Sequence, residues 1–362
     1  QLYSRLKQTR KNLAVKRKVK RKKSISKNYK INTFYKKFEA ILLKNVKKNN
    51  FAIAVSGGPD SLCLAYFGKK YVSNFKNRMH VLIVNHNLRN ESKSEALQVK
   101  EILNKNGIKS KILNWKGKIP RSNIQSKARN IRYSLISNYC LNKKINYLLT
   151  AHHMDDQIEN FFIRLFRGSG VTGLSSMSEI VSYNKELNIL RPLLNFRKSE
   201  LEYVTINYFK TFIKDPSNKD EKFLRVRVRK YRKSMEEDGL DTSKIIKTVN
   251  NLVSANKALN IYKNKAFNKY VSFLSKDRCL VNEAIFSDEA GEIIFRSFSD
   301  ILSLVSGTYY PPRSKKVINL IERLKKNKFK KSTLGGCTIE KKDNFISISR
   351  EQKLKYSIHI GK

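Results

Sequence analysis

The feature that most constrains the fold is a short apolar run that ends directly in a glycine-rich turn. Residues 51–55, FAIAV, have the length and the continuous hydrophobicity of a buried parallel strand. The turn SGGPDS at 56–61 follows, and LCLAYFGKKY at 62–71 then has helical character. The order of strand, glycine-rich turn and helix predicts an α/β fold.

The same alternation continues along the chain as far as residue 167. Further strands are expected at 81–86, 111–115 and 147–152, with helices at 92–106, 123–142 and 155–167. Repeated alternation of this kind predicts a doubly wound parallel sheet of the Rossmann type, with helices on both faces.

The pattern changes after about Asp215. Helical segments dominate up to 272, one more helix is expected at 314–326, and short β runs at 332–351 indicate a hairpin. We therefore expect four parts: a basic, disordered arm at 1–30, the α/β domain at 31–230, a helical region at 231–305 and a small α+β domain at 306–362.

The chain is strongly basic. Lys and Arg number 76 against 29 Asp and Glu, which gives a formal net charge of +47. A field this positive attracts polyanions, and nucleic acid is the natural partner. Because Lys, Asn and Ile are abundant throughout, coding bias explains part of the excess. The run KRKVKRKK at 16–23 repels itself and predicts a solvated arm, which either contacts RNA or has no role.

Cysteine usage and hydropathy limit the classes of protein. The four cysteines lie at 63, 140, 279 and 337, with no CxxC pair. This spacing disfavours a disulfide framework and a cysteine-built zinc or iron–sulfur site, and it fits a reducing cytoplasm. The sequence contains no stretch of about 20 apolar residues, so we expect no transmembrane helix.

The turn at 56–61 has the residue types of a phosphate-binding loop. Backbone N–H groups of two adjacent glycines, with the hydroxyls of Ser56 and Ser61, can surround a phosphate at a helix N-terminus. The candidate nucleotide-binding residues are Ser56, Gly57, Gly58, Pro59, Asp60 and Ser61. A carboxylate at Asp60 would repel a bare phosphate, so a bridging Mg²⁺ is inferred. The alternative is an ordinary Gly-Pro turn between strand and helix.

A second cluster, HHMDDQIEN at 152–160, follows the strand expected at 147–152. His153, Asp156 and either Glu159 or Asn160 are three to four residues apart, so they lie on one helical face or its entry. The end of the strand places them at the carboxyl edge of the sheet, where doubly wound folds bind ligands. Asp155 is assigned to capping the helix.

Arginines supply the remaining candidates. Arg129 and Arg132 are spaced i, i+3 on a helix, and one of them is expected to fork onto a phosphate, unless both are solvated surface residues. Arg225, Arg227 and Arg229 alternate with valines, so they share one strand face or spread round a helix. They are candidates for contacts to a nucleic-acid backbone.

The strand–SGGPDS–helix unit resembles the PP-loop ATP pyrophosphatases. Five further blocks are similar to the tRNA(Ile)-lysidine synthetase family, in that family's order: 85–96, 124–136, 150–177, 190–204 and 215–229. The resemblance is strong over 50–230 and continues more weakly into 314–351. Gln125, Asn160 and Val226 depart from the family's usual residues.

The resemblance implies a specific reaction that consumes ATP with Mg²⁺. The C2 carbonyl oxygen of the wobble cytidine (position 34) in an isoleucine tRNA with a CAU anticodon attacks the α-phosphate and releases pyrophosphate. The ε-amine of free lysine then attacks C2 and displaces AMP, which gives lysidine. The family also suggests a homodimer, no membrane association, and a bacterial cytoplasm, with an organellar matrix or stroma as the alternative.

The resemblance also implies roles for residues. Catalytic roles fall to Asp60, His153, Arg132 and Glu159, metal binding to Asp60 and Asp156, and tRNA contacts to Arg191, Arg225, Arg227 and Arg229. The helical region and the C-terminal domain would bind and recognise tRNA. Two alternatives remain: a PP-loop tRNA thiolase, which the unpaired cysteines disfavour, and a non-catalytic RNA-binding protein, which the intact loop disfavours.

Overall fold

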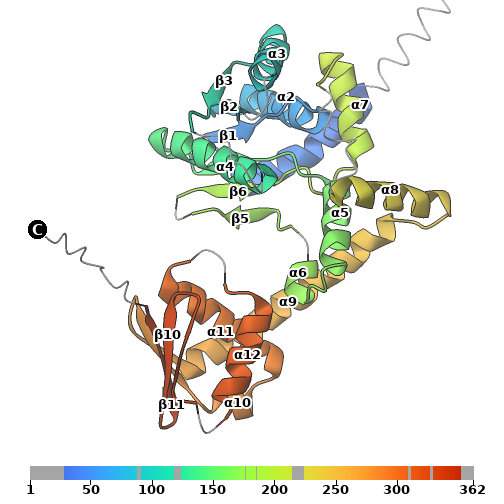
Figure 1. The fold of residues 1–362 in the computed structure, drawn as a ribbon. Helices are drawn as coiled ribbons and strands as arrows, with labels where there is room; N and C mark the ends of the chain where they lie inside the picture. The colour runs from blue at the N-terminus through green and yellow to red at the C-terminus, as the bar shows by residue number, and fades with distance from the viewer. Residues whose placement is uncertain are drawn as a thin grey trace, which may run out of the picture. The chain divides into compact units, whose positions relative to one another are not determined.

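The computed structural model describes residues 28–87, 91–117, 124–175, 177–184, 186–213, 224–308, 311–326 and 329–351. The chain divides into two compact units, Gln1–Val249 and Asn250–Lys362 (Figure 1). The basic arm expected at 1–30 lies outside the described residues, except that 28–30 begin a helix over 28–45.

The first unit is built on a six-stranded sheet in the order β3-β2-β1-β4-β6-β5. The strands are β1 (Phe51–Ala54), β2 (Met79–Asn85), β3 (Ser110–Asn114), β4 (Tyr147–Leu149), β5 (Ile180–Ser182) and β6 (Asn188–Leu190). All neighbouring pairs are parallel except β5 with β6, which is antiparallel. The predicted parallel sheet is confirmed, and the short β5–β6 pair is an addition that the sequence did not reveal.

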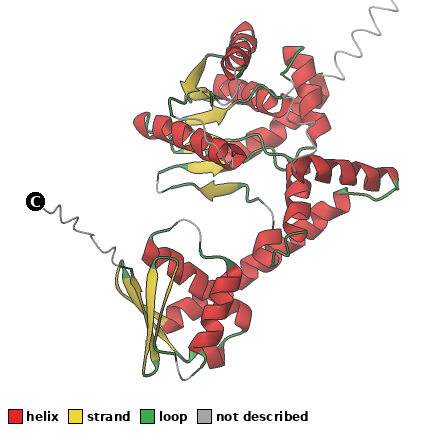
Figure 2. Ribbon diagram, in the orientation of Figure 1, coloured by secondary structure: helices red, strands yellow, loops and turns green. Residues whose placement is uncertain are grey.

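Helices cover both faces of this sheet (Figure 2). They are α2 (Pro59–Asn74), α3 (Ser92–Lys105), α4 (Ile124–Asn142) and α7 (Lys198–Phe209), of which α7 packs on α2. Helices α5 (Met154–Leu165) and α8 (Leu224–Glu237) and the short α6 (Val171–Leu174) lie beyond the sheet. Alternate residues of β1 point to opposite faces of the sheet and supply two hydrophobic cores. Phe51 and Ile53 belong to one core cluster, and Ala52 belongs to the other. The doubly wound arrangement is therefore the one expected.

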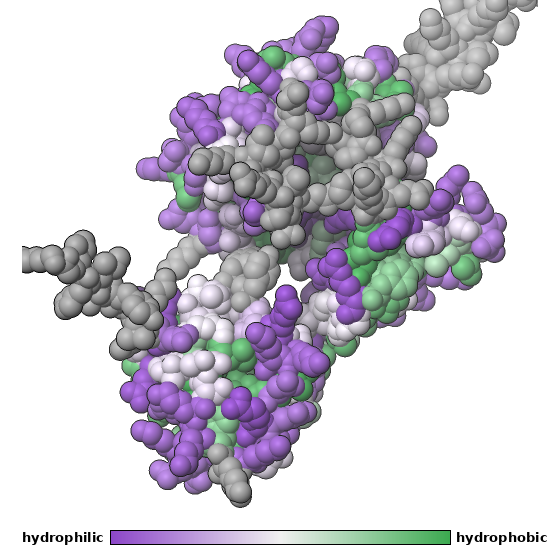
Figure 3. Space-filling model, viewed as in Figure 1, coloured by the Kyte–Doolittle hydropathy of each residue, from purple (hydrophilic) through white to green (hydrophobic). Residues whose placement is uncertain are grey.

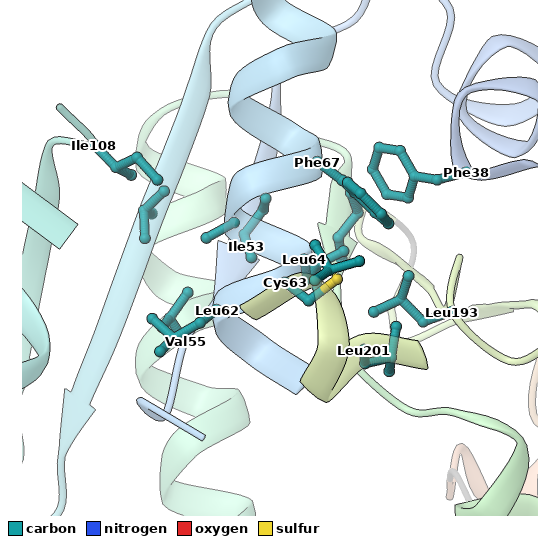
Figure 4. Packing of buried hydrophobic residues seen from close by; sticks show 14 of the residues in the cluster. Phe38, Ile53, Val55, Leu62, Cys63, Leu64, Phe67, Ile108, Leu193 and Leu201 are labelled. Atoms are coloured by element: carbon teal, nitrogen blue, oxygen red, sulfur yellow. The ribbon is translucent and has the colours of Figure 1, made fainter. Parts of the chain in front are cut away.

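The larger core lies between β1 and α2, with the helix over 28–45 and α7 packed on the same side. Figure 4 shows Ile53 of β1 near Leu64 and Phe67 of α2, with Phe38 and Leu201 closing the cluster. A Cβ at Gly68 would come within 2.6 Å of Ile53 Cδ1, so glycine lets α2 approach the strand closely. This contact packs the second half of α2 against β1, whereas the turn at 55–58 sets where the helix begins.

The second unit contains an antiparallel five-stranded sheet in the order β7-β8-β11-β10-β9. The long helix α9 (Ser243–Tyr270) runs into it, and the strands are β7 (Val271–Ser275), β8 (Arg278–Asn282), β9 (Lys331–Leu334), β10 (Cys337–Lys342) and β11 (Phe345–Arg350). Helices α10 (Ile285–Asp288), α11 (Gly291–Ser306) and α12 (Ser314–Leu324) accompany the sheet, and side chains of α11 and α12 share its core.

The expected division at 305/306 does not match this unit. β7 and β8 lie inside the region assigned as helical, and β8 pairs with β11 of the expected small domain. Cys279 of β8, Phe298 of α11 and Ile348 of β11 belong to one buried cluster, so a boundary at 305 would cut through a core. The prediction missed them because β7 is mostly exposed and β8 takes a second partner, β11, that is distant in sequence, so the local hydrophobic pattern of both strands is weak.

No helix within the described ranges combines the length and the apolar character needed to span a membrane.

Candidate active site

The turn after β1 has a backbone that requires glycine at one position. Gly57 has φ of 87°, in the left-handed region. A Cβ there would come within 2.5 Å of Val99 Cγ2, and the Gly57 carbonyl accepts a hydrogen bond from Ile213 N at 2.9 Å. Conformation and close packing therefore both fix this glycine.

Hydroxyl groups hold the turn against the start of α2. Ser61 Oγ donates to the Gly58 carbonyl at 3.0 Å and accepts from Ser56 N at 3.2 Å. Gly58 is the N-cap of α2, where no side chain caps the helix, and Pro59 occupies its first turn. A helix N-terminus without a capping side chain offers N–H groups and a positive dipole end to an anion. The start of α2 therefore offers free N–H groups, and phosphate binding by the six loop residues stays a prediction.

His153 lies among three carboxylates at the entry to α5. Its Nε2 is 3.5 Å from Asp60 Oδ2 and 3.5 Å from Asp156 Oδ2, and its Nδ1 is 3.6 Å from Asp155 Oδ2. The side chain is buried. The structure therefore joins the loop residue Asp60 to the HHMDDQIEN cluster, two sequence segments that the prediction treated as separate parts of one site.

The charge state of His153 follows from these neighbours. Burial opposes the charged form, but Asp155, Asp60 and Asp156 outweigh it and raise the pKa of His153 to about 10. Burial also acts against ionised Asp155, yet His153, the Lys198 N–H and Arg232 hold its pKa well below the usual range. His153 is therefore an imidazolium at neutral pH, and Asp155 is ionised.

The capping role belongs to Asp156, not to Asp155 as predicted. His153 N donates to Asp156 Oδ2 at 3.1 Å, which is the backward bond of a capping box. Asp155 instead accepts from Lys198 N at 2.8 Å and pairs with Arg232 Nη1 at 2.5 Å. Its carboxylate lies between α5, the start of α7 and α8, so it ties three elements together.

Glu159 and Arg229 form an ion pair that bears on both predicted roles. Arg229 Nε is 2.6 Å from Glu159 Oε1, and Nη2 is 3.2 Å from Oε2. Glu159 is 3% exposed and Arg229 is 35% exposed. The ion pair holds α8 against α5 and engages both side chains within the protein, so the catalytic role of Glu159 and the tRNA contact of Arg229 stay predictions.

This pair predicts an asymmetric response to mutation. Arg229→Met leaves a carboxylate buried without its partner, and should lower the free energy of unfolding by about 3 kcal/mol. Glu159→Gln leaves an arginine that water can reach, and should cost only about 1 kcal/mol. Urea unfolding of both variants tests this. The double variant Glu159→Leu/Arg229→Met should recover part of the loss. A larger cost for Glu159→Gln than for Arg229→Met would contradict the assignment.

The predicted phosphate-binding arginines have side-chain neighbours. Arg132 Nη2 lies 3.3 Å from Nε2 of His86, which follows β2, so Arg132 is placed at the carboxyl edge of the sheet. Arg129 Nη2 lies 3.4 Å from the Tyr133 hydroxyl.

Arg225 and Arg227, two of the arginines predicted to contact nucleic acid, are exposed on α8. Of the two arrangements expected for them, strand or helix, the helix is therefore the one found.

His152 is a site residue that was not singled out from the sequence. It lies three residues after Leu149, the last residue of β4, and its Nδ1 is 3.0 Å from Thr150 Oγ1. Burial, with the charges of Arg191, Arg129 and Arg225, lowers its pKa to about 4, so it is neutral at neutral pH. The doubled histidine in HHMDD was the available signal. Adjacent residues at a strand end point differently, so sequence alone did not say which one faces the ligand.

Arg191 does not fit the predicted tRNA contact. Its side chain is 9% exposed, and Nη1 donates to the Ser178 carbonyl at 2.7 Å. The residue follows β6 and lies close enough to His152 to lower its pKa. Arg191 therefore braces the segment before β5 and contributes positive charge inside the site, because burial keeps it from an RNA surface.

The carboxylates are a partial match to a Mg²⁺ site. Across the described ranges, no three ligating side chains are grouped to hold a metal by themselves. Asp60 Oδ1 is buried and has no hydrogen-bond partner, so it has a free acceptor. Mg²⁺ is commonly held by one or two carboxylates with substrate phosphates completing the shell, which Asp60 fits. Asp156 fits the role of a metal ligand less well, because its Oδ2 already accepts a hydrogen bond from the His153 N–H.

The cysteines do not form a sulfur-transfer site. All four are free and buried. Burial raises the pKa of Cys63, Cys140, Cys279 and Cys337, so their thiols stay protonated at neutral pH. Because the thiolate is the nucleophile and the metal ligand, this environment argues against the thiolase alternative.

A family model described as the PP-loop domain matches residues 26–233, more than half of the chain. The protein is therefore a PP-loop enzyme, the class to which the glycine turn and the parallel sheet had pointed. Among solved structures, the U34-tRNA thiolase from Methanococcus maripaludis has a TM-score of 0.54 at 20% identity, covering 63% of this chain and 80% of that one. At this identity the likeness concerns the fold alone.

More similar relatives carry the name tRNA(Ile)-lysidine synthase. The one from Wolbachia pipientis wMel is 38% identical over 307 residues, covering 84% of this chain and 71% of the relative. The one from Orientia tsutsugamushi is 34% identical over 309 residues, covering 83% and 69%. The one from Rickettsia akari is 34% identical over 327 residues, covering 88% and 74%. The chain belongs to the tRNA(Ile)-lysidine synthase family, which confirms the resemblance seen in the sequence.

Proposed function

We propose that this chain ligates free lysine to C2 of the wobble cytidine in a CAU-anticodon isoleucine tRNA, at the expense of ATP. The observation that carries the proposal is Asp60. This residue of the glycine loop is 3.5 Å from His153 of the family's HHMDDQIEN block, with one carboxylate oxygen unpartnered. Together with membership of the family, this joins a phosphate loop to an acid–histidine cluster at one sheet edge.

The first step is adenylation of the base. The N–H groups at the start of α2 bind the β- and γ-phosphates, and Arg132 stabilises charge on the α-phosphate as the C2 oxygen attacks. Mg²⁺, held by Asp60 and the phosphates, supplies neutralising charge when bound. His153 is a fixed imidazolium that keeps Asp60 in place, because it pairs with that carboxylate. Preorganised charges of this type lower the barrier without reorganising during the reaction.

The second step is attack by lysine. The ε-ammonium of lysine must lose a proton before it can act as a nucleophile. Asp156 is the remaining carboxylate beside His153, whereas Glu159 is engaged by Arg229. We assign Asp156 to holding the lysine ammonium, and neutral His152 to the removal of its proton.

RNA contacts are assigned to exposed cations. Arg225 and Arg227, which are exposed on α8, are the preferred candidates for tRNA contacts in the first unit. Arg191 is less suited because it is buried, and Arg229 because it pairs with Glu159. The second unit is the further tRNA-binding region.

We place the enzyme in a bacterial cytoplasm, because its relatives from Wolbachia, Orientia and Rickettsia are bacterial. Sedimentation of the purified chain would test the homodimer that the family suggests.

The test is direct. The full chain is incubated with ATP, Mg²⁺, isotopically labelled lysine and a CAU-anticodon isoleucine tRNA, and the tRNA nucleosides are analysed by mass spectrometry. Lysidine that carries the label, formed with one AMP per product, is expected. A tRNA with uridine at the wobble position serves as the negative control. Sulfur incorporation, or ATP cleavage without labelled nucleoside, would overturn the proposal.

A further inference from the structure

The C-terminal end of α5 carries apolar side chains in solvent. Phe166 directly follows the last residue of α5 and is 63% exposed, and Leu165 is 44% exposed. Figure 3 colours the surface by hydropathy and shows green, hydrophobic areas among the purple, hydrophilic ones. Apolar residues that adjoin one another on the surface of a protein often mark a binding site. The core of the unit does not use these two side chains, so they are accessible to a ligand.

The Phe166 ring is held in a defined orientation. It stacks on Phe162, one turn earlier, with ring centroids 6.1 Å apart and an interplanar angle of 20°. Phe161 meets Phe162 edge-on at 5.9 Å. The backbone also continues the helical pattern, since Phe166 N donates to the Phe162 carbonyl at 2.9 Å. A preorganised ring loses little side-chain freedom when a flat ligand stacks on it.

The loop that follows Phe166 in the chain is open around its glycines. Gly168 has φ of 67°, and a Cβ added at Gly168 or Gly170 would meet nothing within 4 Å. Arg167 is exposed at the start of the loop. Arg164 Nη1 donates to the Gly173 carbonyl, which fastens α6 to α5 and fixes the far end of the loop. An exposed cation and an open glycine loop thus directly follow the aromatic ring in the chain.

We propose that Phe166 is a stacking platform for an unpaired base of the tRNA anticodon loop near the reacting cytidine, with Arg167 beside the RNA backbone. This inference rests on the proposed function. RNA loops are recognised by stacking of splayed bases on aromatic side chains, and Arg pairs with phosphate. The strongly positive net charge of +47 favours RNA over a protein partner for this patch.

The position of α5 supports this choice. The helix begins beside the acid–histidine cluster, and Phe166 follows Asp156 by ten residues, 166 minus 156. At 1.5 Å per residue the separation along the helix is about 15 Å. Stacked nucleotides rise about 3.4 Å each, so the ring is about four stacked nucleotides from the reacting base, or fewer where the loop is extended. A base in the same anticodon loop can therefore reach it.

The experiment measures tRNA affinity and steady-state lysine ligation for the full chain and its variants. Phe166→Ala should weaken tRNA binding and raise the KM for tRNA by about 5- to 100-fold, with the KM for ATP and kcat at saturating tRNA little changed. Phe166→Trp should bind as wild type, whereas Phe166→Leu should behave like Phe166→Ala, because stacking needs a π face. Ile206→Ala, at an exposed apolar residue of α7, is the matched control and should change nothing.

Three results would overturn the inference: wild-type affinity in Phe166→Ala, full rescue by Phe166→Leu, or loss of a dimer in Phe166→Ala that accounts for the effect. The last outcome, seen by sedimentation, would make the patch a contact between copies of the chain. Affinity is measured apart from ligation, so the two proposals fail separately. A wild-type chain that binds tRNA without forming lysidine contradicts the proposed function only.

Discussion

Asp60→Ala is expected to abolish base adenylation and leave tRNA binding nearly intact. Asp60 lies in the first turn of α2, its Oδ2 is 3.5 Å from His153 Nε2, and its Oδ1 is the unpartnered acceptor proposed for Mg²⁺. Loss of one preorganised charge at a reacting phosphate typically lowers the rate by about 10²- to 10³-fold, which would leave almost no adenylation. The measurement is tRNA-dependent pyrophosphate release, followed with and without lysine.

The variant should still fold. Asp155 and Asp156 remain close to His153, so the imidazolium keeps two carboxylate neighbours. Asp60→Asn is the matched control, since it keeps the shape and removes only the charge, and it should be nearly as inactive as Asp60→Ala. Near-normal pyrophosphate release by either variant would show that the loop assignment is wrong. A large loss of tRNA affinity would place Asp60 in an RNA contact instead.

Local pattern predicted most of the first unit because the chain there repeats one simple order. A continuous apolar run such as 51–55 has few structural solutions, and Gly57 with its φ of 87° fixes how that strand turns into α2. The strands of the second unit were harder to predict from the sequence. β7 is mostly exposed and its neighbour β8 takes a second partner, β11, from far along the sequence, so neither has a strong local signature.

The site was predictable in its residue types but not in its pairings. Spacing located His153, Asp156 and Glu159, yet nothing in the sequence showed that Asp60 would lie against His153. Nor did it show that Arg229 would neutralise Glu159, since the partners are separated by two helices and two strands. Contacts between distant segments depend on how elements pack, and a single sequence does not encode that packing in a readable local pattern.

Removal of the second unit is expected to abolish selection between tRNAs while it spares part of the ATP chemistry. The reacting cytidine is also the wobble base of a methionine tRNA with the same CAU anticodon, so a pocket for the base cannot separate the two. Contacts elsewhere on the tRNA must therefore distinguish the isoleucine tRNA from the methionine tRNA, and we assign these contacts to the second unit. Single contacts of this sort are worth about 1–3 kcal/mol each, so the preference for the isoleucine tRNA should fall by about 10-fold or more.

The contacts around α8 determine where the truncated chain should end. A truncation after Arg229 would remove Arg232, which pairs with Asp155, and Glu236, which accepts a bond from Thr242. A cut after Val249 keeps these contacts and follows the boundary between the units. Among the described residues, the buried members of the first unit's two core clusters all lie at or before Phe209, so the truncated chain retains its cores. Circular dichroism checks folding, and lysine incorporation into both tRNAs measures the preference. A folded truncation that favours the isoleucine tRNA by the same factor as the full chain would show that selection lies within the first unit.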